Sequence, residues 1–147
     1  MNYAMELHDS RLEAWQCDEA GRGFALFYAC IHRADGPIFV ENALNHESGW
    51  QRLRFGFYGM RIEGEVNFAE EPYVHEGELW VNGTNSKNII FLPAEHTGEI
   101  CLKMCVSPLF NTVKIHATIM ESELVGEFEP EHVWQEDRPF RAVPQQP

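Results

Sequence analysis

The sequence lacks the features that mark several large classes of protein. It has no apolar run near the roughly 20 residues that a membrane helix needs, and its first residues lack the basic and apolar regions of a signal peptide. Basic residues are scarce, because 11 lysines and arginines stand against 23 acidic residues, for a formal net charge of −12. Such a chain is poorly suited to hold nucleic acid or anionic lipid. We therefore expect a cytoplasmic protein that binds neither nucleic acid nor membranes.

The motifs of common catalytic and metal sites are also missing. The seven histidines form neither H-x-H nor H-E-x-x-H, and no G-x-S-x-G occurs. The cysteines form no C-x-x-C pair and are too few for a disulfide scaffold in 147 residues. They are Cys17, Cys30, Cys101 and Cys105. We expect free thiols, no cofactor, no metal site and a function that is not enzymatic.

Alternating hydrophobic patterns dominate what is present. Hydrophobic residues make up 44% of the chain and aromatic residues 12%, which is enough for a packed core. The alternation predicts strands over 11–17, 24–33, 79–81, 98–106 and from 111 towards 125. With turns at intervals of roughly 8–12 residues and no helical stripe, the pattern predicts an all-β fold. We expect one antiparallel β-sandwich or flattened barrel of about eight to ten strands over residues 1–138, followed by a loose tail over 139–147.

Two glycines give local predictions. The apolar positions alternate in one phase up to Phe57 and in another from Met60, so Gly59 is expected to form a bulge or bend between two sheets. Asn82-Gly83 is a strong signal for a hairpin turn. We expect this turn to belong to a hairpin with a longer loop, whose second strand is 88–92.

The strongest charge feature is the acidic end of the chain. From Glu121 to Asp137 there are seven acidic residues and no lysine or arginine. Charge on the outer face of the last strand would protect a sheet edge, and an acidic surface speeds the association of a basic partner. The leading hypothesis is therefore non-catalytic binding of another, basic protein. The expected contact residues are Glu127, Glu129, Glu131 and Trp134.

Aromatic residues support a second hypothesis, a module that binds a small ligand or a carbohydrate, because aromatic rings stack on sugars and apolar ligands. The residues assigned to this role are Trp50, Tyr58, Trp80, Arg52 and Arg54. Together with Arg61, the two arginines form a local basic cluster. Pairing of this cluster with the acidic final segment across the sheet is the simpler interpretation, and binding of a carboxylate or phosphate is the alternative.

A third hypothesis is a metal-dependent enzyme that brings histidines from distant strands together, such as His32 and His116. The contiguous His8-Asp9-Ser10 contains the residue types of a hydrolase triad, but triad members converge from separate segments. Asp9 and Ser10 are better explained as side chains that bond nearby backbone and fix the entry into the first strand. Exposed sheet edges and abundant aromatic residues also make a homodimer an expectation.

The opening of the chain carries a resemblance to known proteins. The stretch from Glu6 to Leu12, Glu-Leu-His-Asp-Ser-Arg-Leu, is followed by an acidic turn and a long apolar strand. This arrangement resembles the start of a group of small bacterial β-rich proteins of uncharacterised function, some of which are similar to immunity proteins of polymorphic toxin systems. The resemblance implies a compact β fold and a protein-binding role, and it implies no catalytic residues.

Overall fold

The computed structural model describes residues 1–38 and 46–131, and in these residues the chain is almost entirely strand. One turn of 3₁₀ helix, η2 (Phe68–Glu70), is present. The strands are β1 (Asn2–Cys17), β2 (Gly23–Ala34), β3 (Glu47–Tyr58), β4 (Arg61–Glu63), β5 (Val74–Val81), β6 (Thr84–Lys87), β7 (Ile89–Leu92), β8 (His96–Val106) and β9 (Asn111–Pro130). The predicted all-β fold is confirmed. Within the described ranges no helix is long and apolar enough to cross a membrane.

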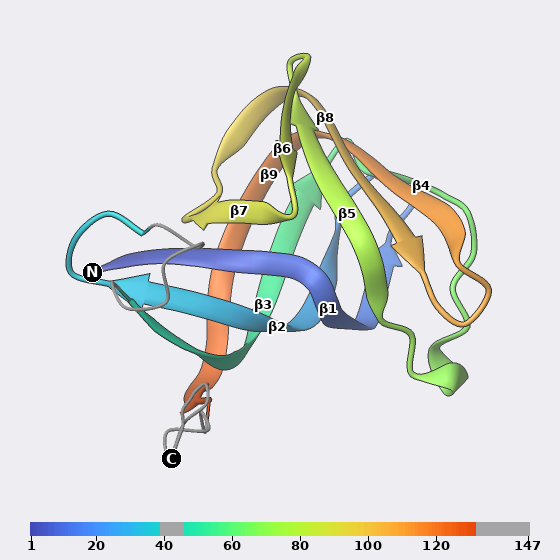
Figure 1. The fold of residues 1–147 in the computed structure, drawn as a ribbon. Coiled ribbons are helices and arrows are strands. Elements are labelled where there is room, and N and C mark those ends of the chain that lie inside the picture. Colours follow the sequence, from blue (N-terminus) through green and yellow to red (C-terminus); the bar gives the residue numbers. More distant parts are fainter. Residues whose placement is uncertain (39–45, 132–147) are drawn as a thin grey trace.

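All nine strands belong to one antiparallel sheet with the order β6-β5-β8-β9-β3-β2-β1-β7, and β4 pairs with β9. The sheet curls around a common interior (Figure 1). The second half of β1 lies beside the segment that precedes β5. There the Leu12 amide donates to the Pro72 carbonyl at 3.0 Å, and the backbones of Arg11 and Tyr73 form an isolated antiparallel β-bridge. The strands form one curled sheet that is not closed, so the structure is neither two packed sheets nor a complete barrel.

The core lies inside the curl, on the face where the apolar residues of each strand alternate inward. Phe27, Phe55 and Phe57 are buried there, with the Phe27 and Phe55 rings 5.8 Å apart in an edge-to-face contact. Burying a side chain of this kind contributes roughly 1.5–3 kcal/mol. The opposite, outer face of β1, β2, β3 and β9 is polar and aromatic, and it carries most of the residues singled out from the sequence.

A sharp bend divides β1 into two halves. Asp9 has a φ of 65°, and the register of β1 with β2 shifts between Glu6 and Arg11. The Ser10 hydroxyl donates to the Leu7 carbonyl at 2.6 Å and is fully buried. The predicted backbone bond of Ser10 is therefore present, but it lies inside a strand that begins at Asn2 rather than before one that begins at Arg11.

Gly59 forms the predicted bend, with a φ of 62° and no room for a side chain, since a Cβ there would lie 2.4 Å from Thr118 Oγ1. The segments on either side, β3 and β4, both pair with β9. The expectation of two sheets was therefore wrong, because the chain bends within one sheet.

The Asn82-Gly83 turn is also present, with φ angles of 51° and 85°, and it joins β5 directly to β6. Positive φ at both central residues is the geometry of a tight hairpin turn. The partner of β5 is therefore 84–87 and not 88–92, because β7 crosses to pair with the first half of β1.

β9 is the longest strand, with 20 residues, and its two halves have different neighbours. Residues up to Met120 pair with β8, and those from Ile119 onwards pair with β3. Beyond Met120 no strand in the described ranges pairs with the other edge of β9, where the Ala94 amide donates to the Ser122 hydroxyl at 2.7 Å. The predicted edge position thus holds for the second half of β9, whereas the strand as a whole lies between β8 and β3.

Candidate functional site

The acidic residues of β9 gather on the outer face of its second half. In this half, the side chains of Ser122 and Leu124 face the interior, and the glutamates between them face solvent. Glu123 lies opposite Arg54 of β3. We call this the β9 acidic surface. It consists of Glu121, Glu123, Glu127, Glu129 and Glu131, all of them exposed. Three of the four predicted contact residues belong to it, and the fourth, Trp134, lies outside the described residues.

A bulge interrupts the regular pairing in the middle of this surface. The register of β3 with β9 shifts between Trp50 and Arg52, and Gly126 has a φ of 75°. The Gln51 side chain donates to the Gly126 carbonyl at 3.0 Å and holds the bulge in place. A bulge of this kind bends the strand and re-aims the side chains that follow it, here starting with Glu127.

Most of the carboxylates on the β9 acidic surface have no ionic partner among the described residues. Within the residues that the structure describes, no lysine, arginine or histidine nitrogen lies within 4.0 Å of the Glu121, Glu123, Glu127 or Glu131 carboxylates. The surface therefore keeps a concentrated negative charge.

The arginines that were expected to pair with this segment have other neighbours. Arg52 donates to Glu13 of β1 at 2.7 and 3.2 Å, and Arg61 lies 3.9 Å from Glu63. The Arg54 guanidinium lies 5.0 Å from the centre of the Phe24 ring. The predicted pairing with the acidic segment was thus wrong for Arg52 and Arg61, because Glu13 of β1 and Glu63 of β4 supply nearer carboxylates.

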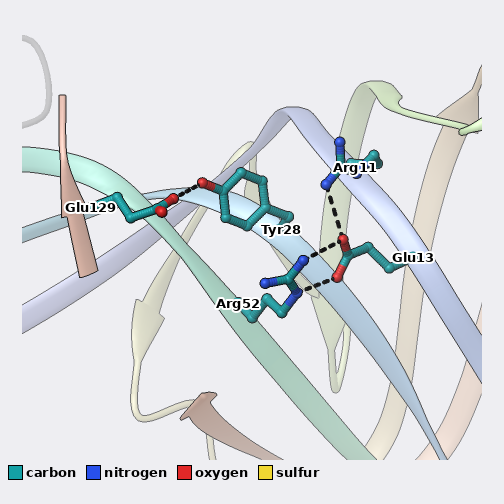
Figure 2. Close-up of polar contacts among 5 residues, drawn as sticks. All are labelled: Arg11, Glu13, Tyr28, Arg52 and Glu129. Carbon is teal, nitrogen blue, oxygen red and sulfur yellow. Dashed lines mark hydrogen bonds and ion pairs between the residues drawn. The ribbon is translucent and has the colours of Figure 1, made fainter. Parts of the chain in front are cut away.

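Tyr28 lies between Glu129 of the acidic surface and two arginines, Arg11 and Arg52 (Figure 2). Its hydroxyl donates to Glu129, and its ring stacks on Trp50 with centroids 5.7 Å apart. The guanidinium groups of Arg11 and Arg52 each lie 5.3 Å from the ring centre, within the range of cation–π attraction. Glu129 is therefore held by Tyr28, unlike the other carboxylates of the surface.

Protonation in this region follows from these contacts. The hydrogen bond to Glu129 raises the pKa of Tyr28, because it is made by the neutral phenol. Burial would raise the pKa of Glu13, but hydrogen bonds from Arg52 and Arg11 outweigh burial and lower that pKa below its ordinary 4.5. Ionised Glu13 is thus stabilised by folding.

Replacing Glu13 with glutamine is expected to make the thermal midpoint less sensitive to acid. A carboxylate with a lowered pKa contributes stability above its unfolded pKa, and that stability is lost as the pH falls through the folded value. Thermal unfolding followed from about pH 7 to about pH 3 should give a shallower slope for Glu13→Gln than for the native chain. Exposed Glu19→Gln, in the β1–β2 turn, is the control. Equal slopes for all three proteins would contradict the contribution assigned to Glu13.

A second polar cluster lies further along the same face and is centred on His32. The His32 Nε2–H donates to Glu6 at 2.8 Å, and Nδ1 lies 2.8 Å from His46 Nε2 and 2.9 Å from Ser48 Oγ. The Cys30 sulfur lies 3.8 Å from His32 Nε2. We call these five residues the His32 cluster. His32 is almost fully buried, with 5% of the residue's surface exposed.

Burial and the neighbouring groups of the cluster shift the pKa values of Glu6, Cys30 and His46. The hydrogen bond from His32 lowers the pKa of Glu6 against the effect of burial. Burial, with the carboxylates of Glu6 and Glu131, raises the pKa of Cys30 to about 12. Burial and the neighbouring His32 lower the pKa of His46. The Cys30 thiol is therefore protonated at neutral pH.

The histidines of the third hypothesis do not meet. His116 lies on β9 and bonds to Glu63 of β4 at 2.9 Å, whereas His32 bonds within its own cluster on β1, β2 and β3. The structure therefore gives no support to a site built from His32 and His116.

The residues assigned to ligand binding are also divided. Trp50 and Arg52 contact Tyr28, whereas Tyr58 and Arg54 line a separate shallow groove of about 310 Å³. Trp80 lies on β5, paired with Asn85 and Cys101, and is 37% exposed. These five side chains do not form one platform.

The lysines lie apart from the acidic surface. Lys87, Lys103 and Lys114 are the lysines of the sequence, and they form part of one cross-strand row with Glu78 and Glu63 over β6, β5, β8, β9 and β4. We call them the lysine row. Lys87 and Lys103 border a groove of about 630 Å³. The first half of β9 therefore carries Lys114 on its outer face, opposite Glu63, whereas the charged residues of the second half are all acidic.

Sequence reasoning missed the Glu13 and Glu6 contacts because they depend on the register of β1, β2 and β3. One signal was available, since Cys30-x-His32 on a strand places both side chains on the same face. The register then sets Glu6 directly opposite Cys30.

No protein-family model matches the chain, and neither a curated protein nor a solved structure matches it. The resemblance of the opening motif to small bacterial β-rich proteins stays a prediction.

Proposed function

We propose that this chain is a non-catalytic binding protein and that the β9 acidic surface receives a basic segment of another protein. One observation carries the proposal. In the described part of the chain, Glu121, Glu123, Glu127 and Glu131 lie without a cation within 4.0 Å, although arginines are present on the neighbouring strand. A partner with lysines or arginines would supply the missing counter-charge.

Electrostatics favours a basic partner at this place. Exposed like charges on one strand repel each other, and several of them together attract a cationic segment over about 10 Å at 0.1 M salt. Such steering raises the association rate and the selectivity more than the final affinity. On the first half of β9 and its neighbours, the lysine row is mixed with Glu78 and Glu63, so a basic partner is attracted there less than to the second half.

The backbone of the second half supports the same choice. Because β9 beyond Met120 pairs with β3 alone among the described strands, an extended segment could add hydrogen bonds along its other edge. The bulge at Gly126 limits such pairing to short stretches. The competing interpretation is that the charges and the bulge only protect the edge from aggregation.

Other expectations from the sequence agree with this proposal without being part of it. The resemblance to immunity-like proteins implies a protein-binding role. A cytoplasmic location, a homodimer and the absence of nucleic-acid or membrane binding remain predictions.

The proposal is tested with an extended peptide of alternating lysine and threonine and with the full chain. We expect the peptide to bind, and its affinity to fall as salt is raised. Charge reversal at Glu121, Glu123 and Glu127 should weaken binding at least about tenfold. These positions leave Glu129 and Glu131, which influence Tyr28 and Cys30, in place.

The matched control reverses three exposed acids that lie outside the β9 acidic surface, Glu19, Glu70 and Glu99, and so changes the net charge by the same amount. Fluorescence anisotropy of the labelled peptide gives the affinities. If both triple variants lost the same affinity for the peptide, binding would depend on net charge and not on the β9 acidic surface. Failure of the native chain to bind, with aggregation of the β9 variant alone, would favour edge protection and overturn the proposal.

A further inference from the structure

We propose that Glu6, Cys30 and His32 form a binding site for Zn²⁺. The carboxylate of Glu6 lies 2.8 Å from His32 Nε2, and the Cys30 sulfur lies 3.8 Å from the same nitrogen. The three ligand atoms lie within 4.8 Å of one another. This inference departs from the expectation of no metal site, and it does not rest on the proposed function.

The strands hold these residues in place. Glu6 is paired with Cys30 across β1 and β2, and His32 follows two residues later on the same face of β2. All three ligands therefore come from two adjacent, hydrogen-bonded strands of the sheet. Ligands on such elements keep their relative positions better than ligands on loops.

The donor atoms suit zinc. A thiolate, an imidazole nitrogen and a carboxylate oxygen are the three ligand types that Zn²⁺ takes in proteins, and hard cations such as Mg²⁺ and Ca²⁺ avoid the sulfur. With zinc distances of about 2.3 Å to sulfur, 2.1 Å to nitrogen and 2.0 Å to oxygen, tetrahedral ligands lie about 3.3–3.6 Å apart. The observed separations of 2.8 and 3.8 Å around His32 Nε2 need only a small adjustment.

The second nitrogen of His32 is held as a metal-binding imidazole requires. Nδ1 lies 2.9 Å from the Ser48 hydroxyl and 2.8 Å from His46 Nε2. The hydroxyl oxygen can accept a hydrogen bond from Nδ1–H. Such a bond fixes the ring and leaves Nε2 for the metal. With zinc on Nε2, the one proton of the neutral His32 ring would lie on Nδ1, facing the Ser48 hydroxyl, and the Cys30 thiol proton would leave to solvent.

Three protein ligands leave a fourth position for water or an added ligand. The simpler alternative is a metal-free hydrogen bond between Glu6 and His32. These interpretations differ over Cys30, because the hydrogen bond does not need the sulfur and the zinc site does.

Cobalt titration of the chelator-treated full chain separates the two interpretations. We expect one equivalent of Co²⁺ to bind, to produce a thiolate-to-cobalt charge-transfer absorption, and to be displaced by Zn²⁺. Cys30→Ser should abolish this absorption and weaken zinc binding at least about tenfold. Cys101→Ser, which alters another half-buried free cysteine, should leave both unchanged.

X-ray absorption of the zinc-loaded native chain gives a test that needs no variant. One sulfur ligand at about 2.3 Å is expected. The proposal is overturned if the native chain binds no cobalt, if the spectrum contains no sulfur ligand, or if Cys101→Ser abolishes the absorption while Cys30→Ser retains it.

Discussion

Replacing Phe55 with alanine is expected to lower the free energy of unfolding by about 3–5 kcal/mol. Phe55 is fully buried in the centre of β3, between β2 and β9. Its ring packs edge-to-face on Phe27 at 5.8 Å and lies 6.3 Å from Phe57. Removal of the ring leaves a cavity among side chains from three strands, and a sheet bonded on both sides of β3 cannot close around it.

Urea unfolding followed by circular dichroism gives this free energy. Phe91→Ala is the matched control, because Phe91 is 62% exposed on β7. The same truncation there should change stability by no more than about 0.5 kcal/mol. Similar losses at both positions would mean that the interior of the curled sheet is not the main core.

Gly23→Ala should have the second largest effect, at or above the upper end of the roughly 1–3 kcal/mol that overpacking usually costs. An added Cβ would lie 1.9 Å from the Gln16 carbonyl oxygen and 2.7 Å from Met60 Sδ. The methionine can move, but the oxygen belongs to the backbone of β1. The pairing of Cys17 with Gly23 at the end of the β1–β2 hairpin would have to open.

The control for this substitution is Gly36→Ala, where no atom lies within 4 Å of the added Cβ. Its thermal midpoint should stay the same or rise slightly, because alanine restricts the unfolded chain. An equally small effect at Gly23 would show that β1 does not approach β2 as closely there as the structure places it.

Much of the fold could be predicted because strand alternation is a local property. The strand predicted over 24–33 differs from β2 by one residue at each end. The first half of β1 was missed, since the bend at Asp9 breaks the alternation. Whether segments share a sheet is not local, and the segments around Gly59 were for that reason placed in two sheets instead of one.

The same distinction applies to the candidate sites. The acidic residues of β9 follow each other in the sequence, so their accumulation is visible there. The partner of Arg52 is Glu13, 39 positions away, and the Glu6–His32 contact spans 26. These contacts are set by the register of β1, β2 and β3, and the sequence alone does not specify that register.

Hydrogen exchange of the backbone amides, with and without the lysine–threonine peptide, tests the binding proposal most directly. The peptide is expected to slow exchange over residues 121–131 and to leave the β5 and β8 amides beneath the lysine row unchanged. Slower exchange over β5 and β8, or unchanged exchange over 121–131 at saturating peptide, would contradict the assignment of the β9 acidic surface as the binding site.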